Sequence, residues 1–418
     1  MPQTRLIGLS LGADHCWPAC FEEIVKKLDL KLPTPDGDTV EFAVERVKVE
    51  PFDLAAKPRY DMVLDRITHW FPTTREWVKK IALDGTYVLN NPWMIQSAEK
   101  HTTYVAMMRL GFPIPKTVLL PPKVYEDEAD TAVTIRRYNK LFSLEATGRS
   151  VGYPLFMKPY DGGAWRGVSK IDDAKALHAG YDGSGKQVMH LQKAVDDWDL
   201  FVRAIGIGPQ VNCIKYDPAA PLHARYVVDF NFMDAGGWQT MQRYARIINS
   251  FFCWDYNSCE ALRSGGVFHP IDFANACPDS QVTSLHYHFP WTVRSLVAWS
   301  LFCTWSGRKP RINPNWQPYF DIADNPELPW EEKFARYDDL ARAYFDTERF
   351  EEFRRTHLRN LDEVCIEFFR TDRAKQIVRE KTAMLFPNHE IEQFTEHFFG
   401  LVQFWCKTES DRIGVSGS

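Results

Sequence analysis

The chain has 418 residues, of which 45% are hydrophobic, 14% aromatic and 25% charged, and its formal net charge is −5. This composition is typical of globular domains, and it excludes collagen-like and wholly disordered chains. Proteins held on nucleic acid by phosphate contacts are normally basic, so the acidic balance argues against that function. Since no apolar run approaches the ~18 residues of a membrane span, we expect neither nucleic acid nor a membrane among the partners.

The nine cysteines are dispersed along the chain, and no Cys-x-x-Cys pair occurs. A disulfide framework favours an even and clustered set, so we expect reduced thiols and a cytoplasmic location. Only Cys16 and Cys20 lie close together in sequence, and no second pair nearby completes a zinc site. We interpret the cysteines mainly as small buried hydrophobic residues.

Residues 1–95 alternate between strand and helix patterns. Strands are predicted at 5–11, 40–49, 60–67 and 86–90, and helices at 21–28 and 73–83, the second with Thr73 as its N-cap. This rhythm is typical of βαβ units and predicts a parallel sheet. No Gly-x-Gly-x-x-Gly follows the first strand, so the pattern gives no support to dinucleotide binding there.

The rest of the chain divides into three further regions, and the fold class predicted is α/β. Residues 96–195 begin with a helix at 97–110 and a polar helical stretch near 127–142, and they continue with strands at 154–160, 168–171 and 188–195. Residues 196–330 add strands and a long helix at 238–253. Apolar residues three and four apart then predict helices over 331–410. We therefore expect four domains, at 1–95, 96–195, 196–330 and 331–418.

Lysines and glycines in the second region have the pattern of a phosphate site. Lys158 ends a strand and is followed by Pro159, so its ammonium group projects from a rigid element, where a point cation suits a phosphate. Lys100, on the helix at 97–110, would place a second cation over the same site. Glycines after Lys158 allow backbone N–H groups to approach anionic oxygens closely; they are Gly162, Gly163 and Gly167.

Oxygen ligands follow later in the chain. Glu260, Asp272 and the amide of Asn275 are hard donors that suit Mg²⁺ bridging phosphates. Side chains alternate along a strand, so Asp272 and Asn275 would point to opposite faces unless a bulge intervenes. Asp199 would accept from ribose hydroxyls, and the backbone of a hinge would read an adenine edge; the hinge residues are Gln192, Lys193, Ala194 and Val195.

Each of these features also has an ordinary structural explanation. Lys158 alone could be a solvated strand end, the Asp-Gly-Gly at 161–163 a hairpin turn, and Asp272 with Asn275 the cap of a turn. The segments that carry these residues, at 90–117, 153–167, 191–199 and 260–278, occur in a meaningful order, however. Together the four segments favour a site for a nucleoside triphosphate.

The order and spacing of these segments resemble the ATP-grasp superfamily, most of all its carboxylate–amine ligase branch, over residues 90–278. In that family a helix lysine precedes a Gly-x-Pro-x-Pro-x-Thr stretch, as Lys100 precedes residues 111–117 here. A Lys-Pro pair comes before a glycine-rich lid loop, as at Lys158. Two departures stand out: Phe273 occupies the place of the acid in the usual Glu-x-Asn, and Phe201 occupies the place of an arginine two after the ribose acid.

The resemblance implies an ATP-grasp fold with an N-terminal βαβ-type domain, a small lid lobe, a core lobe with a metal site, and a helical C-terminal region. It implies ATP and Mg²⁺ as cofactors, and ligation of a small-molecule carboxylate to an amine through an acyl phosphate, with release of ADP and phosphate. Arg225 would stabilise charge at the reacting centre, and Arg166 would contact the γ-phosphate or the acyl phosphate. Many relatives are dimers or tetramers, so a homo-oligomer is among the expectations.

Two other functions are open. A kinase of the same superfamily would phosphorylate a hydroxyl group and would need a basic acceptor pocket, for which the basic cluster at 308–311 is the one supporting feature. A non-catalytic ATP-binding protein would use the C-terminal helices to bind a partner. His286 and His288 would share one face of a strand and could bind a transition metal, but surface or substrate-contacting histidines are the favoured interpretation.

Overall fold

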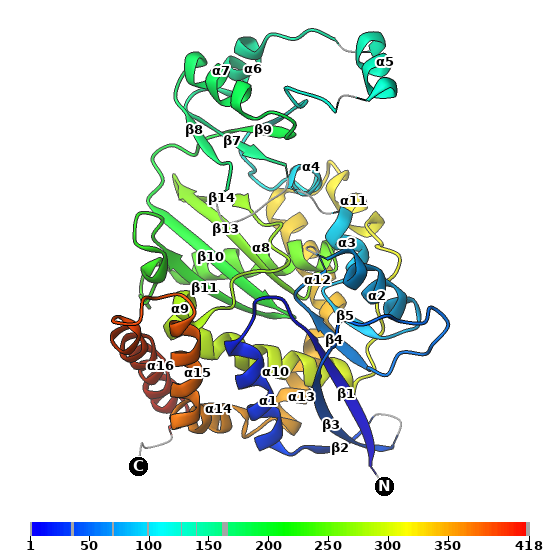
Figure 1. Cartoon of the computed structure of the whole chain (residues 1–418), viewed down its shortest axis with the longest axis vertical. Coiled ribbons are helices and arrows are strands. Elements are labelled where there is room, and N and C mark those ends of the chain that lie inside the picture. The colour runs from blue at the N-terminus through cyan, green and yellow to red at the C-terminus, as the bar shows by residue number, and fades with distance from the viewer. Residues whose placement is uncertain are drawn as a thin grey trace. The chain divides into compact units, whose positions relative to one another are not determined.

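A computed structural model describes residues 2–34, 37–68, 71–97, 100–126, 128–138, 140–160 and 166–414 (Figure 1). Its contacts divide the chain into two compact units. Unit 1 comprises Met1–Ser97, Arg203–Ser258 and Ala276–Ser418, and unit 2 comprises Ala98–Val202 and Cys259–Asn275. The four domains expected from the sequence stay a prediction. No helix in the described part of the chain is both long enough and apolar enough to cross a membrane.

Unit 1 begins with the parallel sheet that the βαβ rhythm predicts. Its strand order is β2-β3-β1-β4-β5, in which β1, β3, β4 and β5 are parallel and β2 pairs antiparallel with β3. The strands are β1 (Gln3–Ser10), β2 (Lys31–Pro33), β3 (Thr39–Arg46), β4 (Met62–Asp65) and β5 (Tyr87–Leu89). All four residues of β4 are buried, as is typical of a strand inside a parallel sheet covered on both faces.

The first helices start earlier than expected. Helix α1 (Cys16–Leu28) begins five residues before the predicted start, because Cys16, Trp17 and Cys20 extend its buried face. Helix α2 (Pro72–Leu83) has Phe71 as N-cap and Pro72 in its first turn, so the prediction of Thr73 as N-cap was wrong. Proline suits that position because the first N–H groups of a helix have no intrahelical partner. Helix α3 (Pro92–Ser97) follows.

The boundary between the units falls inside two strands, β10 (Leu200–Ile207) and β13 (Tyr256–Ser264). Both belong to a five-stranded sheet with the order β12-β11-β10-β13-β14. Its other strands are β11 (Gln210–Tyr216), β12 (Tyr226–Val227) and β14 (Val267–Asp272). Within unit 1, α8 (Ala235–Phe251) packs against β11.

Helix α10 (Phe289–Trp305) is central to unit 1 and was not predicted. Nearly all of its side chains are buried, so it lacks the one-sided apolar pattern by which a surface helix is found in a sequence. In Figure 1 the orange C-terminal helices α14 (Leu361–Phe369) and α15 (Asp372–Ala383) lie beside the blue α1, which also contacts α10. The predicted helical region at 331–410 is confirmed by α12 (Trp330–Phe345), α13 (Thr347–His357), α14 (Leu361–Phe369), α15 (Asp372–Ala383) and α16 (Ile391–Ile413), which α11 (Gln317–Ala323) precedes.

Unit 2 contains a four-stranded antiparallel sheet with the order β6-β9-β7-β8. Its strands are β6 (Thr117–Leu120), β7 (Leu155–Pro159), β8 (Ser169–Ile171) and β9 (Met189–Lys193). Helices α6 (Leu144–Val151) and α7 (Ala174–Gly183) cover one face with a shared apolar core that includes Leu155, Met157 and Leu177. The remaining helices of the unit are α4 (Lys100–Arg109) and α5 (Ala129–Tyr138).

The cysteines are free thiols, as predicted. None of the nine forms a disulfide, and all except the half-buried Cys277 are buried. Burial raises the pKa of the Cys16 thiol to about 12, which keeps it protonated at neutral pH.

The expectation for the two close histidines was wrong. His286 and His288 lie in a short 3₁₀ turn that precedes α10, not on a strand, and both are buried. The Nδ1 atom of His286 accepts from the N–H of Tyr287 at 2.8 Å, and Nε2 of His288 lies 3.3 Å from the carbonyl oxygen of Val227. Burial, together with the charge of His288 and the smaller effects of His397 and His223, lowers the pKa of His286 to about 3, and burial lowers that of His288 to about 4.

These buried histidines should make the protein sensitive to acid. Their folded-state pKa values lie below the ordinary value near 6.5, so only the unfolded chain takes up their protons below that pH. Stability should therefore be lost as the pH falls from about 6.5 towards 4, with a slope of up to about 1.4 kcal/mol per pH unit for each histidine.

The double variant His286→Asn, His288→Gln keeps a hydrogen-bonding atom near each native position and cannot titrate. Its denaturation midpoint should depend less on pH than that of the parent protein between pH 7 and pH 4.5. His389→Asn is the control, because 79% of the His389 side chain is exposed. An unchanged pH dependence in the double variant would contradict the prediction.

Candidate active site in unit 2

Strand β7 places Lys158 on the face of the sheet opposite the apolar core. Its burial alternates, with Leu155, Met157 and Pro159 buried and Lys158 between them half-buried. The ammonium group donates to Oε1 of Gln192 at 2.8 Å, and the Gln192 amide is itself fixed because its Nε2 donates to the hydroxyl of Thr117 at 3.1 Å. Lys158 is thus held by a neighbouring strand, as a positioned cation requires.

A second ammonium group arrives from helix α4. Lys100 is the first described residue of this helix, and its Nζ forms an ion pair with Oδ2 of Asp272. One turn later the hydroxyl of Tyr104 donates to the carbonyl oxygen of Ile271 at 2.7 Å. The same carbonyl lies 3.5 Å from Nζ of Lys158. The end of β14 therefore brings together Lys100 and Lys158, which are 58 positions apart in the chain.

The two predicted acidic ligands meet on a hairpin. Strands β13 and β14 are joined by Gly265 and Gly266, whose φ values of +56° and +81° suit glycine. Glu260 pairs directly with Asp272 across the hairpin, and the register shifts between Glu260 and Ala261. Directly opposed residues place their side chains on the same face of a sheet. The unpaired extra residue is Ile271, directly before Asp272 on β14, so this irregularity does not lie between Asp272 and Asn275, where the sequence left a bulge open.

The charges of these four side chains act on one another. Burial lowers the pKa of Lys158 to about 8; Asp272 and Glu260 raise it, and Lys100 lowers it. Two ammonium groups and two carboxylates therefore lie within electrostatic reach in unit 2. The donors fit a phosphate, and two carboxylates are hard ligands of the type Mg²⁺ prefers. The described ranges contain no group of three or more His, Cys, Asp or Glu that could hold a metal ion.

His190, which no sequence motif indicates, lies opposite Lys158 on β9. It is fully buried, and its ring packs edge-on against Tyr104 with 5.6 Å between ring centroids. Burial, with the charges of Lys158 and Lys100, lowers the pKa of His190 to about 3. Neither ring nitrogen has a hydrogen-bond partner among the described residues. His190 is a neutral wall of the site beneath two cations.

The glycine-rich loop is only partly described. Gly162 and Gly163 lie outside the described residues, and Arg166 is exposed in a turn. Gly167 has φ +72°, and a Cβ atom there would lie 2.8 Å from Cγ of Pro159. Both facts require glycine at this position, since any side chain would strain the backbone and press on the proline that follows Lys158.

The hinge residues and Asp199 have partners in the structure. The N–H of Lys193 donates to Lys116 and that of Ala194 donates to Pro154, at 2.9 and 3.1 Å. Asp199 accepts from both Nε and a terminal nitrogen of Arg263, at 2.9 and 2.7 Å. The predicted contacts of adenine with Gln192–Val195 and of ribose with Asp199 stay predictions.

Two of the predicted site residues, Asn275 and Arg225, do not lie on the strands that carry Lys158, Glu260 and Asp272. Asn275 follows β14 in irregular chain and is half-buried, and its contact with a metal stays a prediction. Arg225 belongs to unit 1, where its Nε donates to the carbonyl oxygen of Ala220 at 3.0 Å. Its role at a reacting centre also stays a prediction.

Charge substitutions should shift the titration of Lys158 in opposite directions. Asp272→Asn should lower the pKa of Lys158 below about 8, and Lys100→Gln should raise it, each by ~1 unit, because a carboxylate stabilises the ammonium form and a second cation destabilises it. The rate of amine labelling at Lys158, followed by mass spectrometry against pH, measures both shifts.

The exposed Lys170 is the internal reference for these labelling rates. Identical titration of Lys158 in both variants would show that the three groups do not share a site.

No protein-family model matches the chain, and no curated protein matches it in sequence. Among solved structures, the RimK domain protein ATP-grasp from Sphaerobacter thermophilus is 14% identical, and the match covers 66% of this chain and 92% of that chain with a TM-score of 0.42. D-alanine–D-alanine ligase from Bacillus anthracis, complexed with ATP, is 12% identical over 82% and 99% of the two chains, with a TM-score of 0.43. The macrocyclase MdnC from Microcystis aeruginosa, bound with precursor peptide MdnA, is 12% identical over 66% and 92%, with a TM-score of 0.42. The chain is thus similar, at low identity, to solved structures that include an ATP-grasp protein, the family its motifs resemble.

Proposed function

We propose that the chain is an ATP-dependent carboxylate–amine ligase that releases ADP and phosphate. The observation that carries the proposal is the meeting of Lys100, Lys158, Glu260 and Asp272 around the end of β14. Two cations with two hard-oxygen acids are suited to a triphosphate and its divalent ion. A nucleophilic side chain is not required, since phosphoryl transfer depends on positioning and charge stabilisation.

The reaction would proceed in two balanced steps. A substrate carboxylate oxygen attacks the γ-phosphorus, the bond from that phosphorus to the β,γ-bridging oxygen breaks, and ADP leaves with that oxygen. The amine then attacks the carbonyl carbon of the acyl phosphate and loses a proton, phosphate leaves, and an amide bond remains.

The chain's own residues bind and orient the nucleotide. Lys158, already held by Gln192, points its remaining donors at phosphate oxygens. Lys100, which forms an ion pair with Asp272, would donate to a phosphate in place of that carboxylate. Glu260 and Asp272 would hold Mg²⁺, which when bound neutralises charge on the phosphates. Arg166 and Arg225 are the proposed contacts of the transferred group.

Removing either side of the site should abolish turnover. Lys158→Ala and Asp272→Ala should each reduce ADP release by at least ~10³-fold, because each removes a charged group that would stabilise the charge on the triphosphate and its divalent ion during phosphoryl transfer. ADP release over a panel of acids and amines is the measurement. Near-normal turnover in either variant would remove that residue from the site.

The matched controls are Lys170→Ala and Asp172→Ala. These two residues form an exposed ion pair with each other in the same unit, so their loss should leave turnover unchanged. Circular dichroism and thermal unfolding establish that all four variants are folded.

Binding of ATP should weaken in alkali. Lys158 carries its proton below a pKa of about 8 and loses it as the pH rises. Affinity for a non-hydrolysable ATP analogue should therefore be constant below pH 8 and fall by up to about tenfold per pH unit above it. Titration calorimetry measures this dependence. Lys158→Arg should flatten it, because a guanidinium stays charged; an alkaline loss of the same size in Lys158→Arg would contradict the assignment.

One residue of the basic cluster that supports the kinase alternative is bound within unit 1. Arg308, in the basic cluster at 308–311, donates to the hydroxyl of Tyr87 at 2.9 Å and to the carbonyl oxygen of Tyr344 at 2.6 Å. Its guanidinium also lies 5.3 Å from the ring centroid of Trp299. These contacts place Arg308 in the packing of unit 1. A product assay separates the two functions, since a kinase would give phosphorylated substrate without free phosphate.

A further inference from the structure

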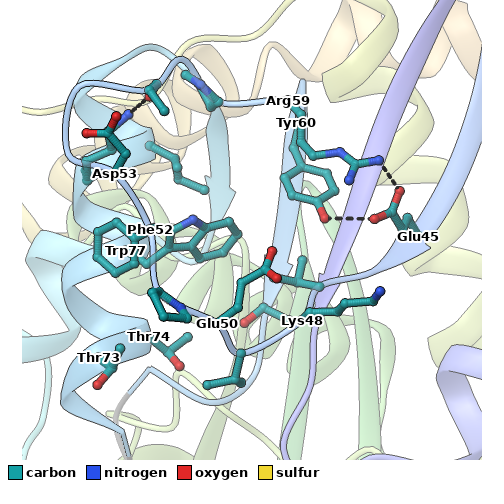
Figure 2. Close-up of a pocket in the computed structure, with 18 of the residues that line it drawn as sticks. Glu45, Lys48, Glu50, Phe52, Asp53, Arg59, Tyr60, Thr73, Thr74 and Trp77 are labelled. Carbon is teal, nitrogen blue, oxygen red and sulfur yellow. Dashed lines mark hydrogen bonds and ion pairs between the residues drawn. The ribbon is translucent and has the colours of Figure 1, made fainter.

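A cavity of about 360 Å³ in unit 1 is lined by none of the residues proposed to bind ATP. Figure 2 shows its walls, which come from the chain after β1, the segment after β3 and helix α2. Apart from Lys80, which pairs with Asp84, and Glu45, which pairs with Arg59, the charged side chains of the wall are exposed and of both signs: Lys48, Glu50, Asp53 and Lys57. The walls therefore favour neither a cation nor an anion, and we assign this cavity no ligand.

Helix α5 of unit 2 is almost unburied in the described chain. Thr131 and Ile135 are half-buried, and its other described side chains are exposed. The helix makes no extensive contact with another described helix or strand, and in Figure 1 it lies apart from α6 and α7. A helix of ten residues is only marginally stable by itself in water. We therefore expect contacts with another molecule to stabilise α5.

Exposed apolar side chains are concentrated in the segment that carries α5. Five of the 19 large hydrophobic residues that are exposed in the described chain lie between positions 119 and 142: Leu119, Val124, Val133, Leu141 and Phe142. Leu141 is 94% exposed, and with Phe142 it lines a cavity of about 420 Å³. Apolar side chains concentrated in this way are typical of an interaction surface.

One face of α5 is suited to pack against a second helix. Ala129, Ala132, Val133 and Arg136 are spaced by three and four positions, so they share a face of the helix. All four are exposed, and they lie on a different side from the half-buried Thr131 and Ile135. Small side chains on such a face allow the axis of a second helix to approach closely.

The charges of this segment are separated between its two ends. Glu128 and Asp130 lie at the start of α5, whereas Arg136 and Arg137 lie in its last turn and Lys140 follows it. This placement suits the dipole of a single helix. It also makes α5 complementary to a second α5 that runs antiparallel, because the acidic end of each helix then faces the basic end of the other. A two-fold interface requires this kind of self-complementary surface.

We propose that two copies of the chain associate through α5, with the two helices antiparallel about a two-fold axis close to Ala132 and Val133. Ala129 of one copy then lies opposite Arg136 of the other, whose guanidinium pairs with Asp130 of the first copy. A parallel pair would place like charges together, so the charges of the segment select the antiparallel arrangement. Val124 and Leu141, which flank the helix in the chain, add apolar surface to the interface.

Charge reversal tests the pairing. Sedimentation velocity of the parent protein, at up to about 100 μM, should find a species with twice the mass of one chain. Glu128→Lys with Asp130→Lys makes α5 basic at both ends, and Arg136→Glu with Arg137→Glu makes it acidic at both ends. Each double variant alone should raise the dissociation constant of the dimer at least ~10-fold, because like charges then face each other. An equal mixture of the two should restore the dimer.

The matched control is Lys170→Glu with Lys175→Glu. These two exposed lysines belong to unit 2 but lie outside the segment that carries α5, so their reversal should leave the dissociation constant unchanged. Binding of an ATP analogue by every variant shows that unit 2 is folded. The inference uses unit 2 alone and holds whether or not the chain is a ligase, so its failure is distinguishable from failure of the ligase proposal.

A cross-link tests the orientation of the helices. Val133, close to the proposed axis, lies near its own counterpart in an antiparallel pair, so Val133→Cys should form a disulfide between two chains on oxidation with diamide. Thr134 lies off the shared face of α5, so Thr134→Cys should not. The native cysteines are buried or half-buried, and the parent protein treated in the same way corrects for them.

Four results would overturn the proposal. A parent protein that is monomeric at 100 μM would leave α5 to a different partner. A dimer that neither charge variant weakens would have its interface elsewhere. A mixture of the two charge variants that stays monomeric would exclude the charge pairing, and equal cross-linking of Val133→Cys and Thr134→Cys would exclude the antiparallel contact.

Discussion

The site in unit 2 depends on holding two ammonium groups near one another. Lys100 and Lys158 repel, and the pKa of Lys158 falls to about 8 mainly because of burial. Two carboxylates on one hairpin offset this repulsion, and one of them, Asp272, forms an ion pair with Lys100. A polyanion entering the site would take over the role of these carboxylates. The two carboxylates thus balance the charge of the two ammonium groups. A bound phosphate chain would replace them in that role, and its divalent ion would balance the carboxylates.

Much of the architecture could be predicted from the periodicity of apolar residues in the sequence. The βαβ rhythm gave the parallel sheet, and spacing of three and four gave the C-terminal helices. Helix α10 could not be predicted because it is buried all round and so has no one-sided apolar pattern. The 3₁₀ turn at His286 and His288 could not be distinguished from a strand, because the pattern covers only three residues. Elements buried on every side carry no amphipathic signal.

The candidate site shows the same limit at the level of single residues. Motif order pointed to Lys100, Lys158, Glu260 and Asp272, which the structure brings together in one unit. Contacts between distant segments could not be predicted from local sequence, because they depend on strand pairing. Examples are the ion pair of Asp199 with Arg263, the burial of His190 and the register shift beside Glu260. The cavity of unit 1 was not predicted either, because its walls come from separate segments.

Unit 2 is assembled from two stretches of chain, 98–202 and 259–275, and its acidic hairpin lies in the second. During synthesis the lysines emerge first, and the ribosome must add more than fifty residues of unit 1 before the carboxylates follow. A nascent chain that ends before residue 260 carries the two lysines of the site without either carboxylate. The four charged groups of the candidate site are therefore complete only late in translation, after most of the polypeptide already exists.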